Sequence, residues 1–156
     1  MLNIIEKFFK GFVNQTLISW YDKDENVSTR YFGLDTIKEN LYQFFDKGWE
    51  KMIRCDDGWI DIIAECHSEL VSIDRNYKIH QIKEKFGTLR YYCEPSHSKY
   101  QEYFNTIINK YERMSIKTCE ISGVSGVLMK KDGWYKTLDP TLGKILGYEK
   151  CKASQY

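Results

Sequence analysis

The chain has 156 residues, a formal net charge of +1 and 42% hydrophobic residues. This length is enough for one domain with its own core, and the near-zero charge gives no overall field to attract nucleic acid or an anionic membrane. The five scattered cysteines are typical of free thiols in a reducing compartment. Because the N-terminus lacks a signal-peptide pattern and no stretch could span a membrane, we expect a cytoplasmic protein.

Apolar residues recur at helical spacing from 2 to 12, which predicts a short amphipathic helix. We expect this helix to pack on the core, and docking to a partner or to a second copy is the alternative. Residues 17–21 and 27–32 follow as the predicted strands of a hairpin, with 22–26 as its turn.

Two longer helices are predicted next. The first begins at Asp35, a suitable helix cap, and its apolar residues keep helical spacing to about Ile53. Asp56 or Asp57 caps the second, which we expect to be central to the core. Its apolar positions are Trp59, Ile62, Ile63, Cys66, Leu70 and Val71.

The chain is organised around residues 78–93, which are predicted to form two strands joined by a tight turn at Phe86 and Gly87. Gly87 is expected to have positive φ, which costs glycine nothing. Strict alternation divides the side chains into two faces. In the first strand, Ile79, Gln81 and Lys83 share one face and His80, Ile82 and Glu84 the other; in the second, Leu89, Tyr91 and Cys93 oppose Thr88, Arg90 and Tyr92.

One face of this hairpin is a candidate anion-binding site. Cationic side chains bind phosphate, and a tyrosine ring offers a surface on which a base stacks. The competing interpretation is that the lysines protect an exposed edge and the tyrosines belong to the core. The candidate ligand-binding residues are Lys83, Lys85, Arg90, Tyr91, Tyr92 and His80.

Residues 100–114 predict another amphipathic helix, whose apolar stripe should cover one face of the hairpin's sheet. The segment from Ile116 onwards is rich in Gly and Lys and predicts short strands with turns, followed by a helix that starts at Pro140. We therefore expect an α+β core over residues 1–115 and a ribbon-like segment over 116–156 packed on the same domain.

Residues 56 to 142 resemble a family of small phage and prophage proteins of uncharacterised function. The resemblance rests on Gly58-Trp59 before a helix, the twelve residues from Gln81 to Tyr92, the segment 119–126 and the segment 134–138. It implies a C-terminal zinc ribbon with two paired ligand positions. In this chain only Cys119 fits, because the other three positions hold Ser122, Asp139 and Leu142.

A structural zinc needs four thiolate or imidazole ligands. We therefore predict a ribbon without metal, held together by Leu128, Trp134 and Leu138, with Cys151 as the one further thiol that can approach Cys119. No cofactor is expected.

No hydrolase or phosphate-loop motif occurs in the chain. Cys66 and His67 are adjacent and so diverge by about 100° around a helix, which does not suit a nucleophile and its base. A nuclease or phosphodiesterase built from His80, Glu84 and Arg90 is a weaker alternative.

The predicted fold is α+β, with a small antiparallel sheet of two β-hairpins packed against three or more amphipathic helices; whether both hairpins share one sheet stays open. The predicted function is a non-catalytic phage accessory protein that binds and inhibits a host protein, for example a defence component. The alternative is a sponge for a phosphate-bearing nucleotide, held across an oligomer interface. Nucleic-acid binding is the third hypothesis.

Overall fold

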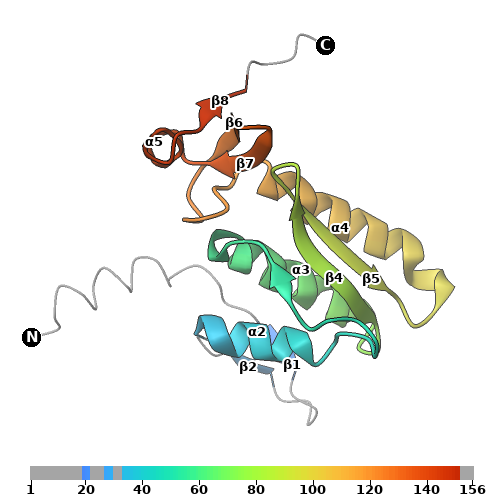
Figure 1. Ribbon diagram of the computed structural model, residues 1–156. Helices are drawn as coiled ribbons and strands as arrows, with labels where there is room; N and C mark the ends of the chain where they lie inside the picture. The colour runs from blue at the N-terminus through green and yellow to red at the C-terminus, as the bar shows by residue number, and fades with distance from the viewer. Residues whose placement is uncertain (1–18, 22–26, 30–32, 152–156) are drawn as a thin grey trace, which may run out of the picture.

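The computed structural model describes residues 19–21, 27–29 and 33–151 and has the predicted α+β class (Figure 1). Strands β1 (Ser19–Tyr21) and β2 (Val27–Thr29) pair antiparallel in a two-stranded sheet of their own. The two hairpins therefore lie in separate sheets, which answers the question that the sequence left open. The predicted turn at 22–26 and the predicted helix at 2–12 lie outside the described residues.

The central sheet has three strands in the order β3–β4–β5. The predicted hairpin is present as β4 (Lys78–Lys85) and β5 (Thr88–Glu94), and its turn has Phe86 at φ 54° and Gly87 at φ 77°. Two successive residues with positive φ are typical of a turn whose twist matches the flanking strands. Strand β3 (Ile53–Arg54) joins β4 in parallel, a pairing that the sequence did not predict.

Helices α3 (Ile60–Ile73) and α4 (Gln101–Ser115) pack together beside this sheet (Figure 1). Short 3₁₀ turns at Asp57–Trp59 and Ser98–Tyr100 precede them. The prediction that α3 is central to the core is confirmed, since five of its six proposed apolar positions are buried and Val71 is half-buried. The buried ones are Trp59, Ile62, Ile63, Cys66 and Leu70. No helix in the described part of the chain is long and apolar enough to cross a membrane.

Helix α2 (Leu34–Tyr42) is shorter than predicted, and its expected continuation to Ile53 is wrong. The backbone leaves the helix to pair with β4: the Ile79 N–H donates to the Phe44 carbonyl at 2.9 Å, and the Asp46 N–H donates to the Ile79 carbonyl at 2.9 Å. Gly48 then turns the chain at φ 92°. Long-range pairing with the sheet thus overrides the helical spacing of the apolar residues.

The C-terminal ribbon contains β6 (Val127–Lys131), β7 (Trp134–Leu138), α5 (Pro140–Ile145) and β8 (Glu149–Lys150), with strand order β7–β6–β8. Proline at the start of α5 confirms the predicted boundary, and the Asp139 carboxylate accepts hydrogen bonds from the two N–H groups of Thr141 and Leu142. The small core of the ribbon consists of Cys119, Met129 and Leu138.

The expected contribution of Trp134 to the packing of this ribbon is wrong. The Trp134 side chain is 75% exposed beside the turn between β6 and β7, whereas Leu138 is buried as predicted. Leu128 is half-buried and faces the β4–β5 turn, because a Cβ on Gly87 would lie 2.4 Å from its Cδ1 atom. Leu128 therefore helps to attach the ribbon to the rest of the molecule.

Polar contacts fix the ribbon against the end of the central sheet. The Thr137 hydroxyl donates to the Gly87 carbonyl at 2.6 Å, and the Gly58 N–H donates to the Glu120 carbonyl at 2.8 Å. Lys136 Nζ lies 3.0 Å from the buried Glu120 carboxylate and 2.6 Å from that of Asp56. These bonds join segments far apart in the sequence, so the ribbon is held in a defined position on the core.

Candidate binding surface on the open face of the sheet

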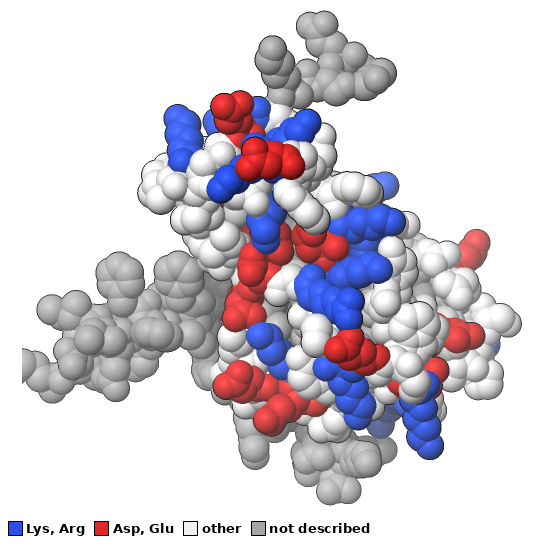
Figure 2. Space-filling model, viewed as in Figure 1, with Lys and Arg blue, Asp and Glu red and all other residues white. Residues whose placement is uncertain are grey.

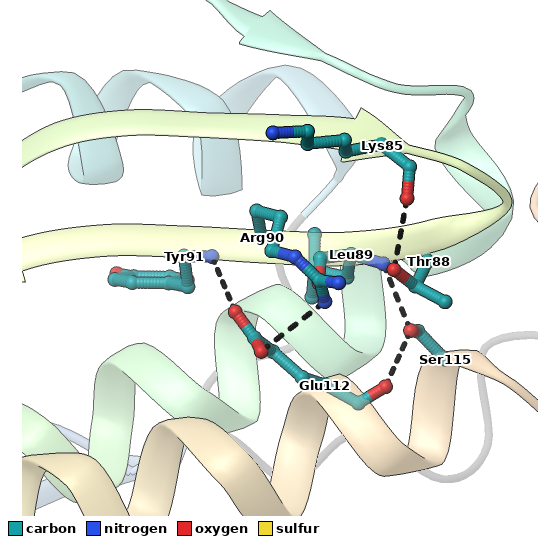
Figure 3. Close-up of polar contacts among 7 residues, drawn as sticks. All are labelled: Lys85, Thr88, Leu89, Arg90, Tyr91, Glu112 and Ser115. Atoms are coloured by element: carbon teal, nitrogen blue, oxygen red, sulfur yellow. Dashed lines mark hydrogen bonds and ion pairs between the residues drawn. The ribbon is translucent and has the colours of Figure 1, made fainter.

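The outer edge of β5 is closed by side chains of α4 (Figure 3). The Leu89 N–H donates to the Ser115 hydroxyl at 2.9 Å, and the Tyr91 N–H donates to the Glu112 carboxylate at 3.2 Å. An unpaired strand edge offers hydrogen bonds to a further strand. Because α4 satisfies these two donors, β5 is not available along this stretch for pairing with another chain.

The hairpin has a buried apolar face and an exposed face that carries cations. The predicted assignment of the β4 side chains to these two faces is wrong. Register shifts between Ile79 and Gln81, where a β-bulge interrupts the alternation. Ile79 and Ile82 are consequently both buried, although strict alternation had placed them on opposite faces. Leu89 and Tyr91 of β5 are buried with them.

The opposite face of the sheet carries a row of cations across all three strands. Arg54 of β3 is the register partner of Lys83 in β4, which is the partner of Arg90 in β5. Figure 2 shows Lys and Arg side chains gathered along β4 and β5, with Asp and Glu side chains mainly on the side of α2 and the start of α3. Like charges placed opposite one another on neighbouring strands destabilise a sheet, so this arrangement favours an anionic partner.

The cations of this row differ in their partners. Arg90 pairs with Glu112 at 3.3 Å, and Arg54 pairs with Glu50. Lys83 Nζ donates to Gln81 at 2.8 Å and lies 5.3 Å from the centre of the Tyr92 ring. Within the described residues Lys83 has no carboxylate partner, and the same holds for Lys85 at the end of β4. These two ammonium groups can therefore bind an external anion without breaking an internal ion pair.

Apolar and aromatic side chains lie next to the cation row. Trp49 and Met52, from the loop before β3, are each 43% exposed, and Tyr92 is 40% exposed. The Trp49 ring stacks on His80 with centroids 5.0 Å apart and planes inclined by 12°. We refer to this region as the open face. It comprises Trp49, Met52, Arg54, His80, Gln81, Lys83, Lys85, Arg90 and Tyr92.

Tyr91 does not belong to the open face, so its proposed stacking role is wrong. Its side chain is 2% exposed, and its hydroxyl lies 2.8 Å from that of Tyr77, which in turn contacts the ring of His67. Burial lowers the pKa of His67 to about 3, so its imidazole is neutral at physiological pH. This buried chain of polar groups stabilises the contact between α3 and the sheet.

The three residues of the predicted nuclease alternative are engaged separately. His80 stacks on Trp49 and lies 3.7 Å from Glu94, whereas the Glu84 carboxylate accepts the Gly87 N–H at 2.6 Å within the turn. Arg90 is bound to Glu112 at the sheet edge. The geometry therefore does not assemble them into one reactive group.

Cys119, the one residue that matches the zinc-ribbon pattern, is buried in the ribbon core. Burial acts to raise the pKa of its thiol, but hydrogen bonds from the Ser122 side chain and from the backbone N–H groups of Asp139, Ser122 and Ile121 outweigh this and lower it. Among the residues that the structure describes, no group of three or more His, Cys, Asp and Glu side chains could hold a metal ion.

No protein-family model, curated protein or solved structure matches the chain. Sequence reasoning found five residues of the open face, Lys83, Lys85, Arg90, Tyr92 and His80, but missed Trp49, Met52, Arg54 and Gln81. The one available signal was Gly48, which interrupts the helical spacing just before Trp49.

Proposed function

We propose that this protein is a non-catalytic binding protein that docks an acidic surface of a partner protein on its open face. The observation that carries the proposal is the cross-strand row of Arg54, Lys83 and Arg90 beside partly exposed Trp49 and Tyr92. Aromatic residues and arginine contribute most of the binding free energy in many protein interfaces. Neighbouring cations then select the charge of the partner and accelerate its association.

The shape of the open face supports a protein partner over a nucleotide. The hollow beside His80 and Lys83 has a volume of about 40 Å³. Sites that enclose small molecules usually measure about 300–1,000 Å³, so this hollow is too small to enclose a nucleotide. A flat partner surface needs no such cavity. The predicted nucleotide sponge therefore receives no support from this part of the molecule.

The resemblance to phage and prophage proteins supplies a biological context for the proposal. In that context the partner is a host protein, for instance a component of antiviral defence, and occupation of its surface is the means of inhibition. Partial exposure of Trp49, Met52 and Tyr92 supports this role, because such residues provide apolar contact area on binding.

Quantitative affinity capture from a lysate of the native host tests the proposal. The wild-type protein should retain a partner in stoichiometric amount, and cross-linking should join that partner to residues of the open face. Lys83→Glu should weaken its retention roughly tenfold or more, because it opposes like charges across the interface. Trp49→Ala should weaken retention by a similar factor through the loss of an aromatic anchor.

Lys117→Glu is the matched control, since Lys117 is an exposed lysine outside the open face and the substitution changes net charge equally. It should retain the partner like the wild type, and thermal melting should show that all three variants are folded. Full retention by both Lys83→Glu and Trp49→Ala would refute the proposal, as would cross-links confined to other surfaces.

A further inference from the structure

A second hollow lies at the far end of the ribbon, between the β6–β7 turn and β8. Its volume is about 510 Å³, within the range of small-molecule sites. It is more than ten times larger than the hollow on the open face. The residues that line it are Lys130, Lys131, Asp132, Gly147, Glu149, Lys150 and Cys151.

The lysines of this hollow lack the internal ion pairs that several other cations of the described chain form. Five cations elsewhere form ion pairs with carboxylates: Lys38, Arg54, Arg90, Lys110 and Lys136. By contrast, within the described part of the chain Lys130, Lys131 and Lys150 have no carboxylate within 4.0 Å, although Asp132 and Glu149 also line the hollow. Among the described residues, the hollow thus contains three cations without a carboxylate partner and two carboxylates.

One of these lysines is already held in place. Lys131 Nζ donates to the Leu146 carbonyl at 2.8 Å, and its side chain passes 3.5 Å from where a Cβ on Gly147 would lie. The Lys130 ammonium lies 5.4 Å from the centre of the Tyr135 ring. A fixed ammonium loses less conformational entropy when it binds an anion, so the hollow is partly organised for binding.

We propose that this hollow binds a phosphate-bearing small molecule through Lys130, Lys131 and Lys150. Ammonium groups form charge-assisted hydrogen bonds with phosphate oxygens, and several of them around one cavity are needed to neutralise more than one phosphate. The site is separate from the open face, so it does not depend on the proposed protein partner. This site would place the predicted nucleotide binding in the ribbon and not on the β4–β5 hairpin.

Cys151 offers a direct test, because its half-buried thiol lines the hollow. The full-length protein is treated with a maleimide in the presence of pyrophosphate or of ATP, and labelling at each cysteine is followed by mass spectrometry. Either anion should slow labelling at Cys151, whereas sodium chloride at equal ionic strength should not. Amide signals of residues 130–132 and 147–151 should shift in the same titrations.

Single substitutions of the lysines identify the contacts. Lys131→Gln and Lys150→Gln should each weaken binding about tenfold or more, because each removes a charge-assisted hydrogen bond. Lys144→Gln removes the same charge from an exposed residue of α5 that does not line the hollow, and should leave the affinity unchanged. Equal weakening by all three variants would show diffuse attraction and overturn the proposal.

Two other results would also overturn it. One is the absence of protection and of amide shifts up to ~10 mM of either anion, which is weaker than any useful affinity. The second is binding to phosphatidylcholine vesicles with about one-fifth phosphatidylglycerol but not to pyrophosphate or ATP, since it would identify a lipid headgroup as the source of phosphate.

Discussion

Gly58→Ala is expected to loosen the ribbon from the core. Gly58 lies in the 3₁₀ turn before α3, where its backbone touches the loop that leads into the ribbon. A Cβ at this position would lie 2.5 Å from the carbonyl oxygens of Cys119 and Glu120 and 2.6 Å from the nitrogen of Gly123. All three are backbone atoms, so no side-chain rotation relieves the overlap.

The expected cost of this substitution follows from these distances. Carbon and oxygen atoms that are not bonded to each other normally approach to about 3.3 Å even in weak Cα–H···O contacts, so the loop must move by most of an ångström. Overpacking in a well-packed region costs about 1–3 kcal/mol, and displacement would also weaken the 2.8 Å bond between the Gly58 N–H and the Glu120 carbonyl. We expect a loss of about 3 kcal/mol in the free energy of unfolding.

Denaturant unfolding measures this change, and amide exchange locates it. Gly33→Ala is the matched control, because among the described residues, its chain neighbours aside, nothing lies within 4 Å of its added Cβ, and its φ of −66° is one that alanine adopts freely. The control should alter the free energy of unfolding by less than about 1 kcal/mol. Equal stability of the two variants, with unchanged exchange in the ribbon, would refute the close contact between Gly58 and the 119–123 loop.

Two further predictions concern buried polar groups. Ser115→Ala leaves the Leu89 N–H without its acceptor. It should lower the free energy of unfolding by about 1–2.5 kcal/mol, after a small gain in helix propensity is deducted, and accelerate hydrogen exchange at the Leu89 amide. Thr106→Ala, which removes an exposed hydroxyl of the same helix, should neither lower the free energy of unfolding by that amount nor change this exchange. The second prediction is that His67 stays neutral on acidification, because burial lowers its folded pKa to about 3. In the unfolded chain His67 has a pKa near 6.5, so between about pH 6.5 and pH 3 the unfolded state binds more protons than the folded state. The free energy of unfolding should therefore fall by about 1.4 kcal/mol for each pH unit of acidification below about 6.5. NMR titration of the imidazole checks this directly, and protonation of His67 near pH 6.5 in the folded protein would contradict it.

The amphipathic helices could be predicted because their burial follows from local spacing. Trp59, Ile63, Cys66 and Leu70 recur three and four residues apart, and only a helix places them on one side. The same criterion failed beyond Tyr42, where apolar residues keep helical spacing but the chain pairs with Ile79 instead. Periodicity reports which residues are buried and not which partner buries them.

The open face was predicted in part for a similar reason. Lys83, Arg90 and Tyr92 come from one hairpin, whose pairing follows from its turn. Arg54 was missed because β3 is a two-residue strand that joins β4 in parallel, across a long connection with no local signal. Tyr91 was included wrongly, because alternation already places it with Leu89, opposite Arg90 and Tyr92, and in the structure its hydroxyl meets that of Tyr77 in the core.

The net charge of the chain does not describe how its charges are distributed locally. The formal net charge of +1 results from 23 cationic and 22 acidic residues, yet these are not evenly mixed over the surface (Figure 2). Screening limits charge interactions to about 8 Å at physiological salt, so a ligand responds to the lysines within that range and not to the molecular total. In the two proposed sites, Lys83 on the open face and Lys131 in the ribbon hollow would therefore matter more than the net charge. Binding at either place should therefore weaken as salt rises, even though the whole molecule is nearly neutral.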